Sequence, residues 1–235
     1  MKNNTFEEIW KGLKKCKKIA MTLHYGPDGD SLGSCTAMKY VLERDLNCQV
    51  TLVSYDPLEE NLSALPYAKE VIFGKDISDL DLASYDTVIC LDSGSLGMLS
   101  GKLKNKFSFP LGTKVLQIDH HNTNSFYGSL NYVDASMPSA CSVLVEFFRS
   151  MKVRFDAELS RRLLLGICTD TGFFGYDNNP LQALKQAVFL IEHGVDYYNE
   201  ISRPVRFSEP LKTKKMFGIL INNLKVDAKK RFAYS

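Results

Sequence analysis

The sequence lacks the features of membrane, secreted and strongly basic nucleic-acid-binding proteins. No apolar run approaches the about 18 residues of a membrane span, and lysines interrupt the N-terminus where a signal peptide needs an apolar core. The six cysteines include no C-x-x-C pair and lie mostly in apolar runs, so we expect buried free thiols in a reducing cytoplasm. The net charge is only +2, which gives no support to a strongly basic nucleic-acid clamp.

Motifs for nucleotide binding and covalent catalysis are also missing. The sequence contains no G-x-G-x-x-G and no G-x-S-x-G, so neither a dinucleotide loop nor a serine nucleophile is supported. The segment from Asp28 begins like a calcium loop, but Leu32 and Lys39 occupy positions that need oxygen ligands. Residues 97–102 hint at a phosphate loop, yet Leu96 replaces its first glycine.

What is present indicates a globular α/β protein. The 235 residues, 45% hydrophobic and 24% charged, suffice for one large domain or for one domain and a fragment. Apolar runs without alternation predict strands covered on both faces over 19–23, 50–54, 87–91 and 115–118. Apolar side chains at helical spacing predict helices over 140–148, 184–191 and 217–224. This alternation predicts a parallel β-sheet flanked by helices on both faces.

Prolines indicate a domain boundary near residue 200. Pro204 and Pro210, with their polar neighbours, break the helical pattern. We expect residues 1–200 to form the first domain. Residues 201–235 are predicted to be a linker and the truncated start of a C-terminal substrate-binding domain, because a helix over 212–224 has no obvious partner.

At four places an apolar run ends and residues able to bind a metal follow at once. Because the carboxyl ends of strands form the ligand crevice of an open α/β sheet, we expect four strand ends to converge on one cleft. Three of the four histidines lie in these segments. The residues are His24, Asp28 and Asp30 after the first run, Asp92 after the second, Asp119, His120 and His121 after the third, and Asp170 after the fourth, Leu163–Cys168.

Each segment taken alone has a simpler interpretation. Asp92 or Asp170 by itself fits a helix N-cap or a turn residue, and Asp119 with its two histidines fits a polar surface cluster. The recurrence of such residues at one topological place favours a shared site. His193 precedes a glycine near a predicted helix end and fits a C-terminal charge partner, so it is left out.

The six candidate ligands offer oxygen and nitrogen atoms and no thiolate: His24, Asp28, Asp30, Asp92, His120 and Asp170. Such a set suits Mn²⁺ or Mg²⁺ better than structural zinc, which favours cysteine. Six ligands exceed what one ion needs if it also holds water and substrate. We therefore expect two ions about 3.5–4 Å apart with a bridging carboxylate, an arrangement that suits in-line displacement at a phosphate ester or anhydride.

The ordered motifs H-x3-D-G-D-S-x-G-S, D-S-G, D-H-H-N and G-I-x-T-D-T-G-x-F resemble the four motifs of the DHH phosphoesterases. The pattern is most similar to the bacterial oligoribonuclease and 3′-phosphoadenosine 5′-phosphate phosphatase subgroup, the nanoRNases. This subgroup lies within the wider clan of RecJ-like exonucleases and manganese pyrophosphatases. The resemblance covers roughly residues 15–225.

The resemblance implies a role for each residue of the four segments. Asp92 would bridge two Mn²⁺ ions, with Mg²⁺ as the alternative. Asp119 would lie behind the ligands and orient a histidine, and His121 would face the phosphate as a hydrogen-bond donor. The ligands implied are His24, Asp28 and Asp92 for one ion, and Asp30, Asp92, His120 and Asp170 for the other.

The resemblance further implies a cytoplasmic enzyme in which a bridging hydroxide attacks phosphorus, with no membrane partner. The implied substrates are short single-stranded RNA, cleaved to mononucleotides, and 3′-phosphoadenosine 5′-phosphate, converted to AMP. Family members carry a second, DHH-associated domain that grips the substrate, and we expect it to be missing here. A RecJ-like exonuclease, a manganese pyrophosphatase and a nucleotide-binding module without turnover stay open as alternatives, as do the cleavage polarity and a homodimer.

Overall fold

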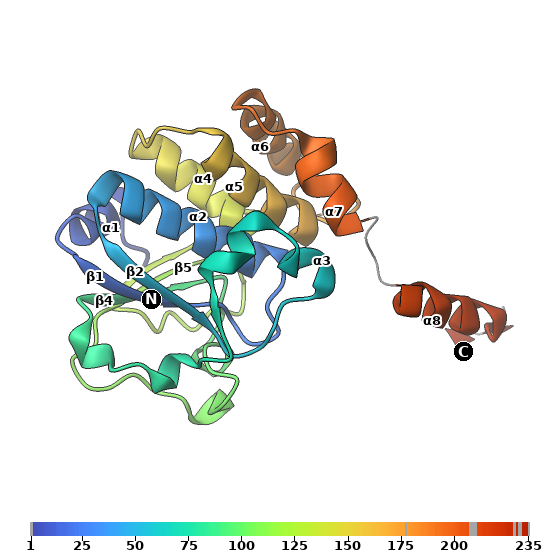
Figure 1. The fold of residues 1–235 in the computed structure, drawn as a ribbon, viewed down its shortest axis with the longest axis horizontal. Helices are drawn as coiled ribbons and strands as arrows, with labels where there is room; N and C mark the ends of the chain where they lie inside the picture. Colours follow the sequence, from blue (N-terminus) through green and yellow to red (C-terminus); the bar gives the residue numbers. More distant parts are fainter. Residues whose placement is uncertain (1, 177, 207–210, 228, 230–231, 235) are drawn as a thin grey trace.

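The computed structural model describes residues 2–176, 178–206, 211–227, 229 and 232–234. A six-stranded parallel sheet forms its centre (Figure 1). The chain starts at β1, moves outward through β2 to β3, and then returns to place β4 on the other side of β1. In such a doubly wound sheet, the reversal leaves a crevice at the carboxyl ends of the two central strands. In spatial order the strands are β3 (Ile72–Phe73), β2 (Gln49–Ser54), β1 (Lys18–Thr22), β4 (Thr87–Leu91), β5 (Val115–Asp119) and β6 (Leu130–Val133).

The predicted α/β fold is confirmed, and the four predicted strands are β1, β2, β4 and β5. Every residue of β4 and β5 is buried, as expected for strands covered on both faces. The two edge strands were not predicted. β3 has only two residues, both exposed, and β6 is half-buried, so neither shows a continuous apolar run.

Long helices cover one face of the sheet. Side chains of α1, α2, α4 and α5 form the larger apolar core with Ile19, Met21, Leu116 and Ile118 of the strands. α6 packs outside α5 and α4 (Figure 1). The predicted helices over 140–148 and 184–191 correspond to α4 and α6. The bounds are α1 (Phe6–Leu13), α2 (Gly29–Leu46), α4 (Ala140–Ser150), α5 (Ala157–Asp170) and α6 (Pro180–Glu192).

Short 3₁₀ turns and loops cover the opposite face. Ala20, Val53 and Val88 point from the strands into a smaller core that Ile77 and Phe107 close from outside. The helices on this face are therefore single turns, because the chain between β3 and β5 is too broken by polar residues for a long apolar stripe. They are η2 (Ile77–Asp79), η3 (Leu82–Ser84), η4 (Leu96–Met98) and η5 (Lys104–Lys106).

Glycines allow α2 and α5 to pack closely. A Cβ on Gly33 would lie 2.5 Å from the carbonyl oxygen of Arg162, and a Cβ on Gly166 would lie 2.3 Å from Oδ1 of Asp30. No side chain fits at either place, so the two helix backbones approach each other directly. This contact brings the start of α2 and the end of α5 to one edge of the sheet.

The remaining elements extend the helical layer and the C-terminal segment. Ile201 and Val205 of the predicted linker are buried in the larger apolar core, whereas 207–210 lie outside the described residues. α8 buries none of its residues and lies apart from the sheet in Figure 1.

None of the described helices has the length and apolarity for a membrane span. All six cysteines are free and five are buried. The elements are α3 (Glu60–Ser63), η1 (Pro66–Glu70), the π-helical turn η6 (Tyr197–Ser202), α7 (Arg203–Arg206), α8 (Leu211–Asn222) and the antiparallel pair β7 (Lys225–Asp227) and β8 (Phe232–Tyr234).

Candidate metal centre

Three of the predicted segments lie at the carboxyl ends of adjacent strands. His24 follows β1, Asp92 follows β4, and Asp119 ends β5. β4 pairs with β1 on one side and with β5 on the other, so the three strand ends meet where the sheet reverses its order. The structure thus brings these segments together at the expected edge.

Asp170 reaches this edge from a helix, and its prediction at a strand end was wrong. The apolar run Leu163–Cys168 belongs to α5, and Asp170 is the last residue of that helix. A buried helix shows the same continuous apolar run as a buried strand, so periodicity alone could not separate them. Oδ2 of Asp170 nevertheless lies 3.3 Å from Nε2 of His120.

Two helix starts fix the first pair of carboxylates. Oδ1 of Asp28 caps α2 by accepting hydrogen bonds from the N–H groups of Asp30 and Ser31, at 3.0 and 2.9 Å. The buried carboxylate of Asp30 accepts from the first two N–H groups of α4, those of Ala140 at 2.6 Å and Cys141 at 3.0 Å. The helix terminus stabilises the carboxylate charge of Asp30, and each Asp30 oxygen accepts one of these bonds and so keeps a lone pair for a cation.

Asp92 adopts a left-handed backbone conformation, with a φ of 53°. Residues other than glycine rarely occupy this region, and strained ones persist where their surroundings hold them. The carbonyl of Ser93 accepts hydrogen bonds from Gln117 Nε2 at 2.9 Å and from the Tyr127 hydroxyl at 3.2 Å. The N–H of Asp92 donates to Ile118. These bonds hold the turn that presents the Asp92 carboxylate.

The carboxylates face the imidazoles at distances that suit shared metal ions. Nε2 of His24 lies 3.6 Å from Asp28 Oδ1 and 3.5 Å from Asp92 Oδ2. Nε2 of His120 lies 3.5 Å from Asp92 Oδ1. These distances exceed the about 2.7–3.2 Å of an N–H···O hydrogen bond, whereas two ligands at right angles on one ion lie about 3 Å apart. Asp92 presents one oxygen to each histidine, which is the geometry of a bridging carboxylate.

Backbone carbonyls orient two of the histidines. Nδ1 of His24 lies 3.0 Å from the carbonyl oxygen of Tyr25, and Nδ1 of His120 lies 3.3 Å from that of Met137. An imidazole that donates its Nδ1–H to a carbonyl keeps the Nε2 lone pair free for a metal. In both residues this Nε2 is the atom that faces the carboxylates.

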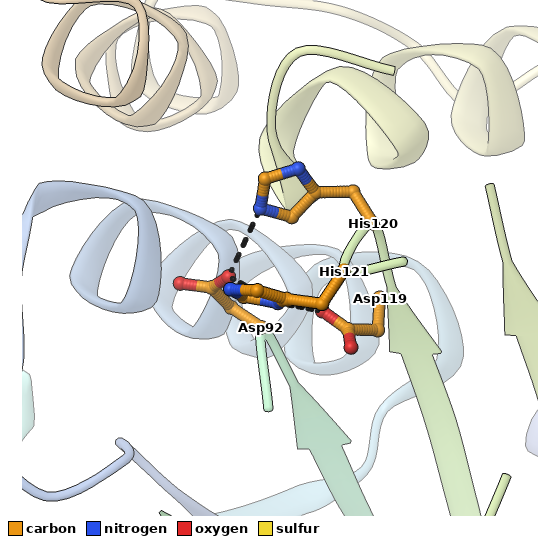
Figure 2. A group of neighbouring side chains, drawn as sticks. All are labelled: Asp92, Asp119, His120 and His121. Atoms are coloured by element: carbon orange, nitrogen blue, oxygen red, sulfur yellow. Dashed lines mark hydrogen bonds and ion pairs between the residues drawn. The ribbon is translucent and has the colours of Figure 1, made fainter. Parts of the chain in front are cut away.

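The next histidine is turned the other way. Nδ1 of His121 donates to Oδ1 of the fully buried Asp119 at 2.8 Å, and Asn124 Nδ2 donates to the other oxygen. Figure 2 shows His120 directed at Asp92 while His121 is held between Asp92 and Asp119. The Nε2 of His121 makes no hydrogen bond with any residue the structure describes, so it is available to a ligand.

The carboxylates raise the pKa of both ligand-facing histidines. Burial opposes the charged form of His24, but contacts with Asp28 and Asp92 outweigh it and raise the pKa to about 11. Burial likewise opposes the charge on His120, and its contacts with Asp92 and the neighbouring acids raise the pKa to about 10. The hydrogen bond that His121 donates to Asp119 raises the pKa of His121 above its ordinary value.

The carboxyl groups respond in opposite directions. Burial raises the pKa of Asp30 well above its usual range, and the nearby charges of Asp92 and Asp170 raise it further. Burial also raises the pKa of Asp170, to about 6 despite the proximity of His120. Burial disfavours the charge on Asp92 too, but the two imidazoles hold its pKa below the usual range. Two acids therefore lack a sufficient counter-charge, which a divalent cation would supply.

We call this set the carboxyl-edge cluster: His24, Asp28, Asp30, Asp92, Asp119, His120, His121 and Asp170. Its possible ligand atoms fall into groups whose members lie within 4.8 Å of one another: His24, Asp28 and Asp92; Asp30, His120 and Asp170; and Asp92, Asp119, His120 and His121. The first two groups offer only oxygen and imidazole nitrogen, and Asp92 adjoins both. This donor set fits two hard divalent cations.

Several residues around the cluster were not found from the sequence. The predicted helix over 140–148 already placed the start of α4, but no local pattern showed that its first two N–H groups bond to Asp30. Asn124, which holds Asp119, carried no distinguishing pattern. The carbonyls of Tyr25 and Met137 are backbone groups, so their role cannot be read from residue type.

Comparisons with known proteins agree with this architecture. The model of the DHH family, N-terminal domain, matches residues 18–167. The bifunctional oligoribonuclease and PAP phosphatase NrnA of Thermus thermophilus is 29% identical over 202 residues, which are 86% of this chain and 58% of the relative. The protein of the same name from Bacillus subtilis is 24% identical over 92% of this chain and 66% of its own length. The chain thus spans about three fifths to two thirds of these relatives.

A solved structure shares the fold. The crystal structure of an exopolyphosphatase-related protein from Bacteroides fragilis superimposes with a TM-score of 0.87. The alignment covers 97% of this chain and 67% of that protein, with 20% sequence identity. At this identity the likeness supports the arrangement of helices and strands alone.

Proposed function

Since the chain belongs to the DHH family, we propose that it hydrolyses phosphoester bonds with two divalent metal ions held by the carboxyl-edge cluster. The single observation that carries this proposal is the position of Asp92. One of its oxygens faces His24 and the other faces His120, so a single carboxylate joins two groups of ligands. A pair of ions with a shared carboxylate is the arrangement used for in-line displacement at phosphorus.

The proposed ligands are those implied by the family motifs. His24, Asp28 and Asp92 would hold one ion, and Asp30, Asp92, His120 and Asp170 the other; Mn²⁺ is the proposed metal and Mg²⁺ the alternative. The distances and the orientation of each Nε2 support this division. When bound, the ions would lower the pKa of a water molecule and neutralise charge on the phosphoryl oxygens.

Asp119 and His121 would act on the substrate side of the centre. Asp119 fixes the His121 ring through Nδ1, which leaves Nε2 to face the phosphate as a donor. The raised pKa of His121 favours its protonated form, which suits a donor to developing negative charge. His120 and His121 thus divide two tasks: the first binds metal and the second contacts the phosphate.

For the substrate, we propose short oligoribonucleotides cleaved to mononucleotides, and 3′-phosphoadenosine 5′-phosphate cleaved to AMP, in the cytoplasm. The relatives named as oligoribonuclease and PAP phosphatase support this choice. They are longer than this chain, so the test must ask what these 235 residues do by themselves.

The test is hydrolysis of a labelled RNA dinucleotide with Mn²⁺, with an Asp170→Ala variant as the control. We expect mononucleotide release by the wild type and a loss of several orders of magnitude in the variant, because the second ion loses a ligand. Equal turnover by both proteins would refute the proposal.

Two further measurements separate the alternatives. Faster phosphate release from inorganic pyrophosphate than nucleotide release from RNA would identify a pyrophosphatase. Nucleotide binding in calorimetry without any product after long incubation would identify a binding module.

A further inference from the structure

A cavity of about 360 Å³ adjoins the candidate metal centre. Asp28 forms part of its lining, and so do Thr169 and Gly172 on either side of Asp170. Its volume lies in the lower part of the range for small-molecule sites, about 300–1,000 Å³. A ligand with a phosphate at the metal centre could therefore extend directly into this cavity.

The far wall is built from segments that hold one another in place. Asn61 of α3 donates from Nδ2 to the carbonyl of Val205 in α7 at 3.0 Å, and both residues line the cavity. The guanidinium of Arg206 lies 4.9 Å from the ring centre of Phe173, another lining residue. The wall therefore exists before any ligand arrives, which lowers the entropic cost of binding.

Tyr176 offers an open aromatic face in this cavity. Three successive residues, Gly172, Phe173 and Phe174, have φ values of 55°, 55° and 68°, which turn the chain back on itself after Asp170. The Tyr176 ring consequently lies against Gly172, where an added Cβ would come within 2.6 Å of it. The side chain is nevertheless 63% exposed. The hydroxyl end of the ring is held close to the backbone at Gly172, and the exposed remainder of the ring offers area for stacking.

Among the residues that the structure describes, the charged ones in the lining are both acidic, and the Arg206 guanidinium is stacked on the Phe173 ring of the wall. Glu59 is exposed and begins α3 without a side-chain capping bond, and Asp28 is the other. No lysine or arginine appears among the described lining residues. Such a lining repels a second phosphate. It suits a planar group that stacks on an aromatic ring and carries N–H donors for a carboxylate.

We propose that this cavity binds the nucleobase of the nucleotide whose phosphate lies at the metal centre. Tyr176 provides the stacking surface, and Glu59 accepts a hydrogen bond from an amino or ring N–H group of the base. The inference rests on the proposed function for its phosphate subsite and extends it with a subsite for the base.

Binding of 2-aminopurine ribonucleoside 5′-monophosphate in the presence of Mg²⁺ tests the proposal, because stacking on an aromatic ring quenches the fluorescence of this base. We expect saturable quenching by the wild type. Tyr176→Ala should weaken the apparent affinity about 5- to 100-fold, the range for loss of one base–aromatic stack. Tyr176→Phe should retain it. Ribose 5-phosphate, which lacks a base, should bind equally to the wild type and to Tyr176→Ala.

Tyr198→Ala is the matched control. Tyr198 is exposed to a similar extent, 58%, and does not line the cavity, so its removal should leave the affinity unchanged. Absence of quenching by the wild type, or equal affinity in Tyr176→Ala, would overturn the inference. A wild type that binds the probe but never hydrolyses RNA would refute the proposed function and leave the base subsite standing.

Discussion

Helix α5 carries a buried charged group in its second turn and a half-buried one at its last residue, and the surroundings of the two groups balance their charges differently. Arg162 is 5% exposed, and its guanidinium lies 2.8 Å from Glu70 and 3.4 Å from Glu158. We call these three residues the Arg162 cluster. Asp170 belongs instead to the carboxyl-edge cluster, in which five carboxyl groups accompany three imidazoles. In the first cluster Arg162 and the neighbouring Arg161, which lies 3.3 Å from Glu158, balance the two glutamates, whereas in the second cluster five carboxyl groups outnumber three imidazoles.

The difference separates a structural cluster from a functional one. A buried charge with partners of opposite sign needs nothing from outside, although removing one partner is destabilising. Carboxylates that face one another raise each other's pKa and favour any cation that enters. Excess charge of one sign, rather than burial alone, is therefore what marks the carboxyl edge as a binding site.

The largest expected effect comes from Asp92→Asn. Asp92 contacts both ligand-facing histidines, so its loss should disrupt both ions. Loss of several kcal/mol of transition-state stabilisation corresponds to a fall of about 1,000-fold or more in Mn²⁺-dependent hydrolysis. Urea unfolding of the metal-free protein should show a variant that still folds but is less stable than the wild type, because Asp92 pairs with two protonated imidazoles. If Asp92→Asn is unfolded, rather than folded and inactive, the carboxyl-edge cluster would be as structural as the Arg162 cluster. The distinction between the two clusters would then fail.

Arg162→Met should give the opposite result. It leaves Glu70 without its partner, while Glu158 keeps Arg161 at 3.3 Å, and it removes a hydrogen bond to the Thr36 carbonyl; we expect the free energy of unfolding to fall by about 3 kcal/mol. The folded fraction should bind Mn²⁺ as the wild type does. Arg149→Met is the control, because this arginine is 51% exposed and lies 3.7 Å from Glu146, so about 1 kcal/mol or less is expected. Urea titrations of the three proteins provide the measurement.

Asp119→Asn should affect the centre without removing a ligand. The loss of an orienting carboxylate behind a metal-site histidine typically reduces activity or metal affinity about 10- to 100-fold. Asp119 raises the pKa of His121, so the variant should lose activity at a lower pH than the wild type as His121 deprotonates. pH–rate profiles of the two proteins test this shift. Parallel profiles that differ only in height would assign Asp119 a purely structural role.

Metal affinity should increase with pH. In the metal-free fold, His24 and His120 have pKa values of about 11 and 10 against 6.5 when unperturbed, so both are protonated near neutrality. Their ion pairs stabilise the metal-free fold fully below pH 6.5 and are lost as the pH rises through 10 to 11. Metal must displace these protons, and each one released changes the binding free energy by about 1.4 kcal/mol per pH unit. Mn²⁺ titrations at pH 6, 7 and 8 should show this dependence; a flat profile would contradict it.

The sequence was sufficient for the parts of the protein that have a local signature. Apolar runs located β1, β2, β4 and β5, and the polar residues that follow them gave His24, Asp92 and Asp119. Asp170 was grouped with them because an apolar run ends before it; that run is helical rather than a strand, but the end of α5 reaches the same edge of the sheet. These residues could be predicted because a strand end confines the next side chain to one edge of a sheet.

Features that depend on distant contacts could not be predicted. The buried position of Arg162 could not be predicted from the sequence. One partner, Glu70, lies far away along the chain, and the other, Glu158, stands four residues earlier on α5, a spacing that is common on exposed helix faces. The glycine contacts between α2 and α5 and the left-handed φ of Asp92 likewise arise from packing. The base subsite requires Asn61 and Val205 to meet across 144 residues of sequence, which no local pattern specifies.

The most direct test of the account is anomalous diffraction at the manganese edge from crystals of this chain grown with Mn²⁺. We predict two peaks about 3.5–4 Å apart, one between His24 and Asp28 and the other between His120 and Asp170, with an Asp92 oxygen on each. A single peak, or peaks elsewhere with the carboxyl-edge cluster empty, would contradict the two-ion centre on which the proposed function depends.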